Sequence, residues 1–235
     1  MTPSDRHLDL GCGKFPRNPY GRRELCGVDV RPAPAGADFE HRVANLSLQP
    51  IPYGDDGFAS VSAYDFIEHV PRLLATGDGR GTVFPFVQLM NEVWRVLAPG
   101  GRFYALTPAY PHLEAFTDPT HVNVITAKTH EYFCGPQPLA RMYGFTGEFK
   151  VVRAQWVRAL DAYEQMPGLN EARKPKTGLK RLALHWRGFT RRLRGKPDPS
   201  GKVHFLWELD AVKAPGTRQA APAASVRNGV RDRYL

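Results

Sequence analysis

The stretch His7-Leu8-Asp9-Leu10-Gly11-Cys12-Gly13, residues 7–13, joins a short apolar run to two closely spaced glycines. The apolar run predicts a buried strand, and the Gly-x-Gly sequence predicts a tight turn at the end of that strand. Glycine has no Cβ and readily adopts positive φ, so the backbone of such a turn can approach a bound ligand closely. A helix after the turn would add free N–H groups and the positive end of its dipole. We therefore expect a ligand site at this turn.

Farther along the chain, apolar segments with the lengths of strands and helices alternate. We expect strands at residues 25–30, 58–66, 102–106, 149–157 and 203–212, and a helix at residues 86–97. The sequence Pro99-Gly100-Gly101 should end that helix before the next strand begins. Strands and helices that alternate at these lengths indicate parallel βαβ units, whose sheet is covered on both faces. The chain is therefore expected to have an α/β fold.

Asp29 ends the second apolar run, 20 residues after Asp9. In a doubly wound sheet this position lies beside the glycine turn, and a carboxylate there can accept hydrogen bonds from both hydroxyls of a ribose. The dinucleotide fingerprint needs a third glycine where this chain has Pro16, which lacks an N–H donor. A pyrophosphate ligand, and with it a dehydrogenase, is therefore disfavoured. A nucleoside ligand that carries a carboxylate and no phosphate fits the turn better.

Five segments, in chain order, carry a resemblance to a known family. They are HLDLGCG at 7–13, GVDV at 27–30, PIPYGDDGFASVSAYDFIEHV at 50–70, NEVWRVLAPGGRFYALTP at 91–108, and HVNVIT followed by GF between 121 and 145. With these motifs, residues 7 to about 150 resemble the class I methyltransferases that depend on S-adenosylmethionine (SAM). The resemblance implies a Rossmann-like, doubly wound, mostly parallel seven-stranded sheet with helices on both faces and an antiparallel last strand. It also implies SAM as the cofactor and methyl transfer as the reaction.

The resemblance further implies a cofactor-binding role for ten residues. They are Asp9, Gly11, Cys12, Gly13, Asp29, Val30, Asn45, Leu46, Tyr64 and Asp65. Asp9 and the glycine turn would contact the methionine portion of SAM, Asp29 the ribose, and Val30 the adenine. Asn45 lies where many relatives have an acidic residue for the adenine amino group, and its side-chain carbonyl can still accept that hydrogen bond. The last two residues of the set would line the methionine and methyl side.

Methyl transfer to a hydroxyl or an amine needs a base, which the loop at residues 117–123 can supply. This loop should overhang the strand ends, where acceptors bind in this fold. We expect His121 to act as the base and Asp118 to orient it or the acceptor. Alternatively, His121 only anchors the next helix, because Asp-Pro-Thr-His is also a good turn and helix-cap sequence. No ligand spacing marks a metal site in Asp118, His121 and His130, so no metal is expected.

The positive charge of the chain lies in its C-terminal part. The net charge is +9; residues 1–150 hold 14 Lys and Arg against 16 Asp and Glu, whereas residues 151–235 hold 18 against 7. Residues 179–194 place apolar side chains at helical spacing among Lys and Arg, which predicts a basic amphipathic helix. Such a helix fits an anionic membrane surface, an acidic substrate or nucleic acid. Its apolar stripe can equally pack on the domain and leave the charges solvated.

We expect one SAM-binding methyltransferase domain over residues 1–213, with a basic helical insertion at about 160–200 before the last strand and a disordered tail at 214–235. No signal peptide or membrane-spanning stretch is evident, and three widely spaced cysteines suit a reducing compartment. A cytoplasmic protein is therefore expected, with peripheral membrane contact as an alternative. The expected acceptor is a small molecule, a glycan or a lipid-linked intermediate, and nucleic acid is less favoured. The alternative function is a non-catalytic SAM-binding or membrane-associated adaptor.

Overall fold

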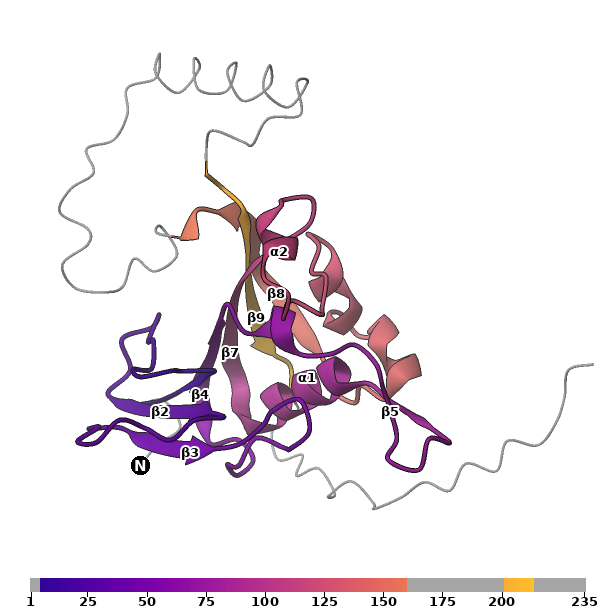
Figure 1. Cartoon of the computed structure of the whole chain (residues 1–235). Coiled ribbons are helices and arrows are strands. Elements are labelled where there is room, and N and C mark those ends of the chain that lie inside the picture. The colour runs from indigo at the N-terminus through magenta and orange to yellow at the C-terminus, as the bar shows by residue number, and fades with distance from the viewer. Residues whose placement is uncertain (1–4, 160–200, 214–235) are drawn as a thin grey trace, which may run out of the picture.

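A computed structural model describes residues 5–159 and 201–213, so the expected insertion at 160–200, with its helix at 179–194, and the tail at 214–235 lie outside the described residues. A seven-stranded sheet has the order β3-β2-β1-β4-β7-β9-β8 (Figure 1). Its strands are β1 (Arg6–Leu10), β2 (Glu24–Asp29), β3 (Glu40–Val43), β4 (Phe58–Tyr64), β7 (Leu97–Pro108), β8 (Phe149–Val157) and β9 (His204–Ala211). β9 is antiparallel to β7 and β8, and the other neighbours pair in parallel. This topology confirms the expected α/β fold with its antiparallel last strand.

The longest helix among the described residues is α1 (Pro85–Val96). It buries Phe86, Leu89, Met90 and Val93, the spacing of a single helix face, and burial of each such side chain contributes roughly 1.5–3 kcal/mol. Shorter elements are η2 (Ile67–His69), α2 (Glu114–Thr117), η3 (Thr129–Phe133), η4 (Leu139–Tyr143) and the hairpin of β5 (Leu74–Ala75) and β6 (Thr82–Val83). None of the helices in the described ranges has the length and apolar character needed to cross a membrane.

Side chains of β1 alternate between the two faces of the sheet. Leu8 and Leu10 enter the large apolar core, which also holds the buried side chains of α1, η3 and η4. His7 and Asp9 therefore point to the opposite face. There Tyr20, from the loop at 14–23, packs against a smaller cluster that includes β4 and β7 side chains. Within the described part of the chain, α1, η3 and η4 thus share one face, and a loop covers part of the other.

The helix expected directly after the glycine turn does not form. Residues 14–23 run as turns and extended chain to the start of β2. Pro16 and Pro19 each remove a backbone donor from this segment, and Gly21 takes a positive φ of 60°. These three residues explain why the chain cannot continue as a helix here. A ligand at the turn is therefore held without a helix dipole.

Two strands differ from the sequence-based expectation. β7 begins at Leu97, directly after α1, because Leu97 pairs with Phe58 and an irregularity absorbs Pro99-Gly100-Gly101 before Arg102 pairs with Ser60. The sequence analysis did not predict β3, whose residues Glu-His-Arg-Val are mostly exposed at the sheet edge. Such an edge strand lacks the apolar alternation by which strands are recognised.

Candidate functional site

The glycine turn after β1 has a conformation that requires glycine. Gly11 and Gly13 have φ values of 66° and 60°, and a Cβ on Gly11 would lie 2.5 Å from Cδ2 of Phe66. The amides of Gly11 and Cys12 donate to the carbonyl of Val28 over 2.8 and 3.2 Å. The turn is therefore fastened to the end of β2 and packed closely against the residues that follow β4.

Asp29 closes β2 and connects it to the same turn. Its Oδ2 accepts a hydrogen bond of 2.9 Å from the amide of Gly13, and its Oδ1 accepts from the amide and Nε of Arg31 at 3.0 and 3.2 Å. Burial acts to raise the pKa of this carboxyl, but the bonds from Arg31 and Gly13 together hold the pKa below its usual value. The carboxylate is therefore ionised and fixed in place beside the turn.

A cavity of about 410 Å³ opens at the carboxyl ends of β1, β2 and β4. Six of the ten predicted cofactor residues line it: Gly11, Asp29, Val30, Asn45, Leu46 and Asp65. Arg31, Phe66 and His69 are among the other lining residues. The sheet order reverses between β1 and β4, and ligands of doubly wound proteins bind outside the strand ends at such a point. The structure thus gathers residues from four separate sequence segments around one cavity.

The remaining four predicted cofactor residues, Asp9, Cys12, Gly13 and Tyr64, do not line this cavity. Asp9 is fully buried and accepts hydrogen bonds from the Ser62 hydroxyl at 2.6 Å and the Arg17 amide at 2.8 Å. Burial raises the pKa of Asp9 to about 7. The side chain of Tyr64 packs at 5.2 Å against the ring of Tyr104. Asp9 therefore supports the turn and the loop after it from inside the fold.

Other residues that line the cavity offer both polar and apolar contacts. The side-chain oxygen of Asn45 accepts from the amide of Ser47 at 3.1 Å and retains a second lone pair. Val30 is 62% exposed, whereas Leu46 is buried, and both line the cavity. A flat ring can therefore contact apolar side chains while its edge meets a hydrogen-bond acceptor.

Asp65 is paired with a residue that sequence analysis missed. Asp65 follows β4 with a φ of 46°, and its Oδ1 lies 3.1 Å from Nε2 of His204 at the start of β9. His204 pairs with Pro108 in the antiparallel ladder of β7 and β9. An antiparallel last strand begins at the edge where the parallel strands end, so the expected topology contained the signal for this residue. The sequence around His204 indicates only a strand, so it does not single out this residue as functional.

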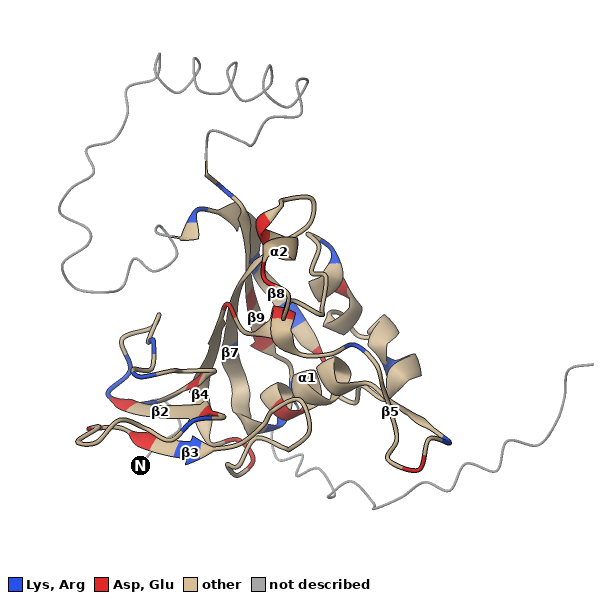
Figure 2. Ribbon diagram, in the orientation of Figure 1, with Lys and Arg blue, Asp and Glu red and all other residues tan. Residues whose placement is uncertain are grey.

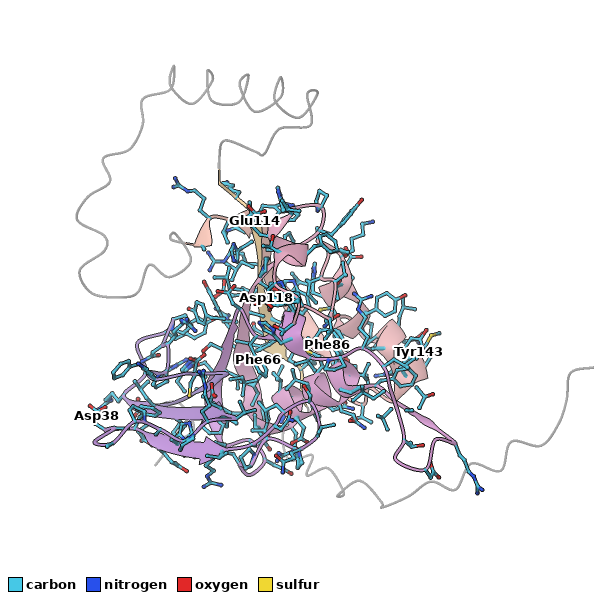
Figure 3. The ribbon with its side chains drawn as sticks, in the orientation of Figure 1. Asp38, Phe66, Phe86, Glu114, Asp118 and Tyr143 are labelled. Carbon is cyan, nitrogen blue, oxygen red and sulfur yellow. The ribbon has the colours of Figure 1, made fainter. Side chains whose placement is uncertain are left out.

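A second polar cluster lies where η2 meets the loop at 117–123. The rings of His69 and His121 are 4.8 Å apart, and Glu68 is buried next to them. Asp118 Oδ1 accepts from the amide and hydroxyl of Thr120, and its Oδ2 lies 4.0 Å from Nε2 of His121. Figure 3 labels Phe66 and Asp118, which follow β4 and α2. The structure thus brings the two predicted catalytic residues close to each other and to His69, which lines the cavity.

Burial raises the pKa of the Glu68 carboxyl to about 8. The nearby Thr107 hydroxyl acts to lower this pKa, although its own hydrogen bond goes to the carbonyl of Pro108 at 3.2 Å. His130, which had been weighed as a metal ligand with Asp118 and His121, instead packs in the core with its ring 5.8 Å from Trp207. That combination is therefore not assembled.

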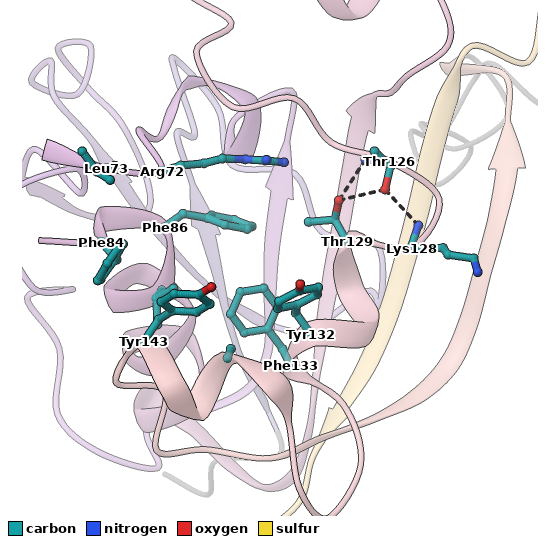
Figure 4. A pocket seen from close by; sticks show the side chains of 12 residues that line it. Arg72, Leu73, Phe84, Phe86, Thr126, Lys128, Thr129, Tyr132, Phe133 and Tyr143 are labelled. Atoms are coloured by element: carbon teal, nitrogen blue, oxygen red, sulfur yellow. Dashed lines mark hydrogen bonds between the residues drawn. The ribbon is translucent and has the colours of Figure 1, made fainter. Parts of the chain in front are cut away.

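A second, more apolar cavity of about 570 Å³ lies between α1, η3 and η4 (Figure 4). Five of its twelve lining residues are aromatic, among them Phe84, Phe86, Tyr132 and Tyr143, and Arg72 and Lys128 contribute cations. It shares no lining residue with the cavity at the strand ends. None of the residues predicted to act on the cofactor or the acceptor belongs to it.

No protein-family model and no curated protein matches the chain. Solved structures do resemble it in fold. A SAM-dependent methyltransferase from Archaeoglobus fulgidus superposes with a TM-score of 0.51 at 14% identity, covering 87% of this chain and 85% of that one. A Haloferax volcanii protein described as a methyltransferase, in complex with the Trm112 methyltransferase activator, gives 0.50 at 16% identity, covering 91% and 85%. With the strand order, these likenesses show that the chain has the fold of the class I, SAM-dependent methyltransferases.

Proposed function

We propose that the protein binds SAM in the cavity at the ends of β1, β2 and β4 and transfers its methyl group to an acceptor. The observation that carries the proposal is the ionised carboxylate of Asp29, fastened to Gly13 at the mouth of a cavity of about 410 Å³. The volume lies in the usual range of small-ligand sites, roughly 300–1,000 Å³. A ribose diol is a strong match for a carboxylate held in this way.

The residues of the cavity suit the separate parts of SAM. Asp29 would accept from the ribose hydroxyls, Asn45 from the adenine amino group, and Val30 and Leu46 would flank the ring. The sulfonium and its methyl group would then lie toward Asp65. Bound SAM supplies an electrophilic methyl group, so the chain has to hold the acceptor in line and accept its proton. Cys12, Gly13 and Asp9 would act by shaping the turn.

Acceptor deprotonation is assigned to the edge that carries Asp65, His204, His69 and His121. The sequence predicts His121 as the base and Asp118 as its orienting partner. Nε2 of His121 lies 4.0 Å from Oδ2 of Asp118. A neutral imidazole in this position can accept a proton at Nε2. The Asp65–His204 pair at 3.1 Å is a second polar group at the same edge.

For the acceptor we favour a small molecule, a glycan or a lipid-linked intermediate in the cytoplasm. Nucleic acid is less favoured because the described sheet and loops carry acidic and basic side chains interspersed (Figure 2), and residues 1–150 hold more Asp and Glu than Lys and Arg. Peripheral contact with an anionic membrane through residues 179–194 remains part of the proposal. Co-sedimentation with vesicles of anionic lipid at low salt tests that contact. If the protein does not bind the vesicles, the membrane contact is refuted.

Calorimetry of the full chain with SAM and with NAD tests the cofactor. Saturable binding of SAM and none of NAD is expected, and indifference to SAM at millimolar concentration would overturn the proposal. Transfer of labelled methyl from SAM to fractionated cell extract then tests catalysis and isolates the acceptor. Binding without any labelled product would favour the non-catalytic adaptor.

A further inference from the structure

The carboxyl group of Glu68 is buried without the partners that such a group normally has. Glu68 is 1% exposed, and within the described residues neither of its side-chain oxygens has a hydrogen-bond partner. Buried carboxyl groups are costly unless they are hydrogen-bonded, paired with a charge or bound to a metal ion. The position of Glu68 in η2 therefore indicates a partner that the described side chains around it do not supply.

Two imidazoles face this carboxyl group from different segments. The cluster offers one carboxylate oxygen and two imidazole nitrogens that all lie within 4.8 Å of one another. These atoms belong to Glu68, His69 and His121. The chain brings them together because the loop at 117–123 is hydrogen-bonded to η2: the amide of Asn123 donates to the carbonyl of Glu68 at 2.9 Å, and its side-chain amide donates to the carbonyl of Ile67 at 3.0 Å. The cluster therefore rests on a fixed backbone.

The hydrogen bonds of His69 define its neutral tautomer. The hydroxyl of Thr120 donates to Asp118 at 2.6 Å, so its oxygen can only accept from Nδ1 of His69, 2.9 Å away. The carbonyl of Thr120, 3.2 Å from the same nitrogen, is also an acceptor only. The proton of His69 is therefore on Nδ1, and Nε2 carries the lone pair.

His121 has the same arrangement. Its Nδ1 lies 3.3 Å from the carbonyl of Ala115, which can only accept. The lone pair is thus on Nε2 here as well. A metal-binding histidine typically donates its other ring N–H to a carbonyl or carboxylate, which fixes the tautomer and the ring. Both imidazoles of this cluster show that outer arrangement.

We propose that Glu68, His69 and His121 form a site for one divalent transition-metal ion of the Zn²⁺ type. Two imidazole nitrogens and one carboxylate are a recognised ligand set for such ions and leave at least one position open. Tetrahedral Zn²⁺ with bonds of about 2.1 Å holds its ligand atoms about 3.4 Å apart, so ligand atoms that lie up to 4.8 Å apart must close by up to about 1.4 Å on binding. Rotation of the two imidazoles, neither of which is fully buried, would supply this movement. The site replaces the expectation of no metal.

The open position gives the ion a role beside the cofactor cavity, which His69 also lines. An acceptor hydroxyl bound to the ion would pass its proton to solvent water more easily, because a divalent cation stabilises the oxyanion. His121 would then hold the ion, with its Nε2 lone pair engaged, and would not take the proton itself. This role rests on the proposed function, whereas metal binding is measured without SAM.

The test uses the untagged full chain, freed of metal with a chelator and titrated with Zn²⁺ and with Co²⁺, whose visible absorption reports its ligands. One saturable equivalent is expected. Glu68→Gln, His69→Ala and His121→Ala should each weaken Zn²⁺ binding at least tenfold, since changes even in the outer shell of metal sites typically cost 10–100-fold. Glu68→Gln has nearly the shape of a protonated Glu68, but it cannot ionise to give the carboxylate ligand. His41→Ala on β3 is the control and should bind Zn²⁺ as the parent does.

Thermal unfolding and SAM binding of each variant report whether it has folded. Absence of saturable Zn²⁺ binding, or equal affinity in folded forms of all three variants, would overturn the metal site. Zn²⁺ binding that depends on the three residues in a chain that ignores SAM would support the site and refute the proposed function. SAM binding without Zn²⁺ binding would support the proposed function and refute the metal site. His121 would then remain the proposed direct base.

Discussion

The backbone amide of Gly13 donates a hydrogen bond of 2.9 Å to Oδ2 of Asp29, so the turn after β1 and the end of β2 form one unit. Arg31 contributes two further bonds to Oδ1. A carboxylate has about four lone-pair sites, so three are in use. The side chain of Arg31 is 76% exposed and its bond is readily exchanged, which would leave two sites for the two hydroxyls of a ribose.

Asp29→Ala should weaken SAM binding about ten- to a hundredfold, or roughly 1.5–3 kcal/mol, because the charged acceptor for the ribose is lost. The fold should persist, since the Gly13 amide can bond to water at this partly open site. Isothermal titration calorimetry measures the affinity and circular dichroism the fold. An affinity equal to that of the parent would show that the ribose lies elsewhere.

Two control variants accompany this measurement. Asp38→Ala changes an exposed carboxylate between β2 and β3 and should leave the affinity unchanged. Arg31→Ala removes the exchangeable bond to Asp29 and should bind SAM as tightly as the parent or slightly more tightly. A large loss in Arg31→Ala would mean that the guanidinium itself holds the ligand.

Gly11→Ala should destabilise the fold more than Gly13→Ala. Both positions have positive φ, which costs an alanine about 1–2 kcal/mol. Only the Cβ at Gly11 would also meet Phe66, at 2.5 Å, and such overpacking typically adds about 1–3 kcal/mol. Urea unfolding measures both free energies. Equal losses would mean that Phe66 moves aside without cost.

The sequence was sufficient to predict six residues that line one cavity, because these residues follow from local chemistry. The Gly-x-Gly turn and the acidic residue that ends the second strand are local signals, and Gly11 of the turn and Asp29 both line the cavity. The partners of Asp9 could not be predicted from the motif, for a geometric reason. Alternation in β1 directs its side chain into the fold, where Ser62 and Arg17 use its oxygens, and a motif does not reveal such partners.

Contacts between distant segments could not be predicted from the sequence. Glu68 and His69 are some fifty residues from His121, and His204 is far from Asp65, so only the assembled sheet and its loops bring these groups together. The missing helix after the glycine turn has a local cause in Pro16, Pro19 and Gly21. The Gly-x-Gly motif predicts a helix here, but these three residues prevent it. The basic segment at 179–194 lies outside the described residues, and its role stays a prediction.

The pH dependence of stability should change in Asp9→Asn. Folding raises the pKa of Asp9 from 3.8 to about 7, so the folded chain keeps a proton there that the unfolded chain loses. The stabilisation that this gives, relative to Asn, is complete below about pH 4 and is lost as the pH rises through 7. The difference in unfolding free energy between parent and variant should therefore grow, as the pH falls from 7 to 4, by an amount on the order of a few kcal/mol.

His7 gives this experiment an internal reference. Burial lowers the pKa of His7 to about 3, and its ring nitrogens lie 2.8 Å from the hydroxyls of Ser60 and Ser62. Its effect has the opposite sign, because stability is lost as the pH falls below 6.5 and the unfolded chain takes up the proton. Asp9→Asn should unmask this acid-side loss. Parallel stability curves for parent and variant would contradict the assignment to Asp9.

His204→Asn should slow methyl transfer while leaving SAM binding within about threefold of the parent. Nε2 of His204 lies 3.1 Å from Asp65 Oδ1, at the strand edge where the methyl group is proposed to lie, and His204 does not line the cofactor cavity. Removal of a proton-transfer group typically costs about 10²–10⁴-fold in rate. The assay uses the acceptor isolated from cell extract. Proton transfer is assigned to His204 if kcat falls by that amount and the pH profile of kcat/KM also loses one limb. A fall in kcat with an unaltered pH profile would instead show that His204 only positions Asp65, and an unchanged kcat would exclude the pair from the reaction.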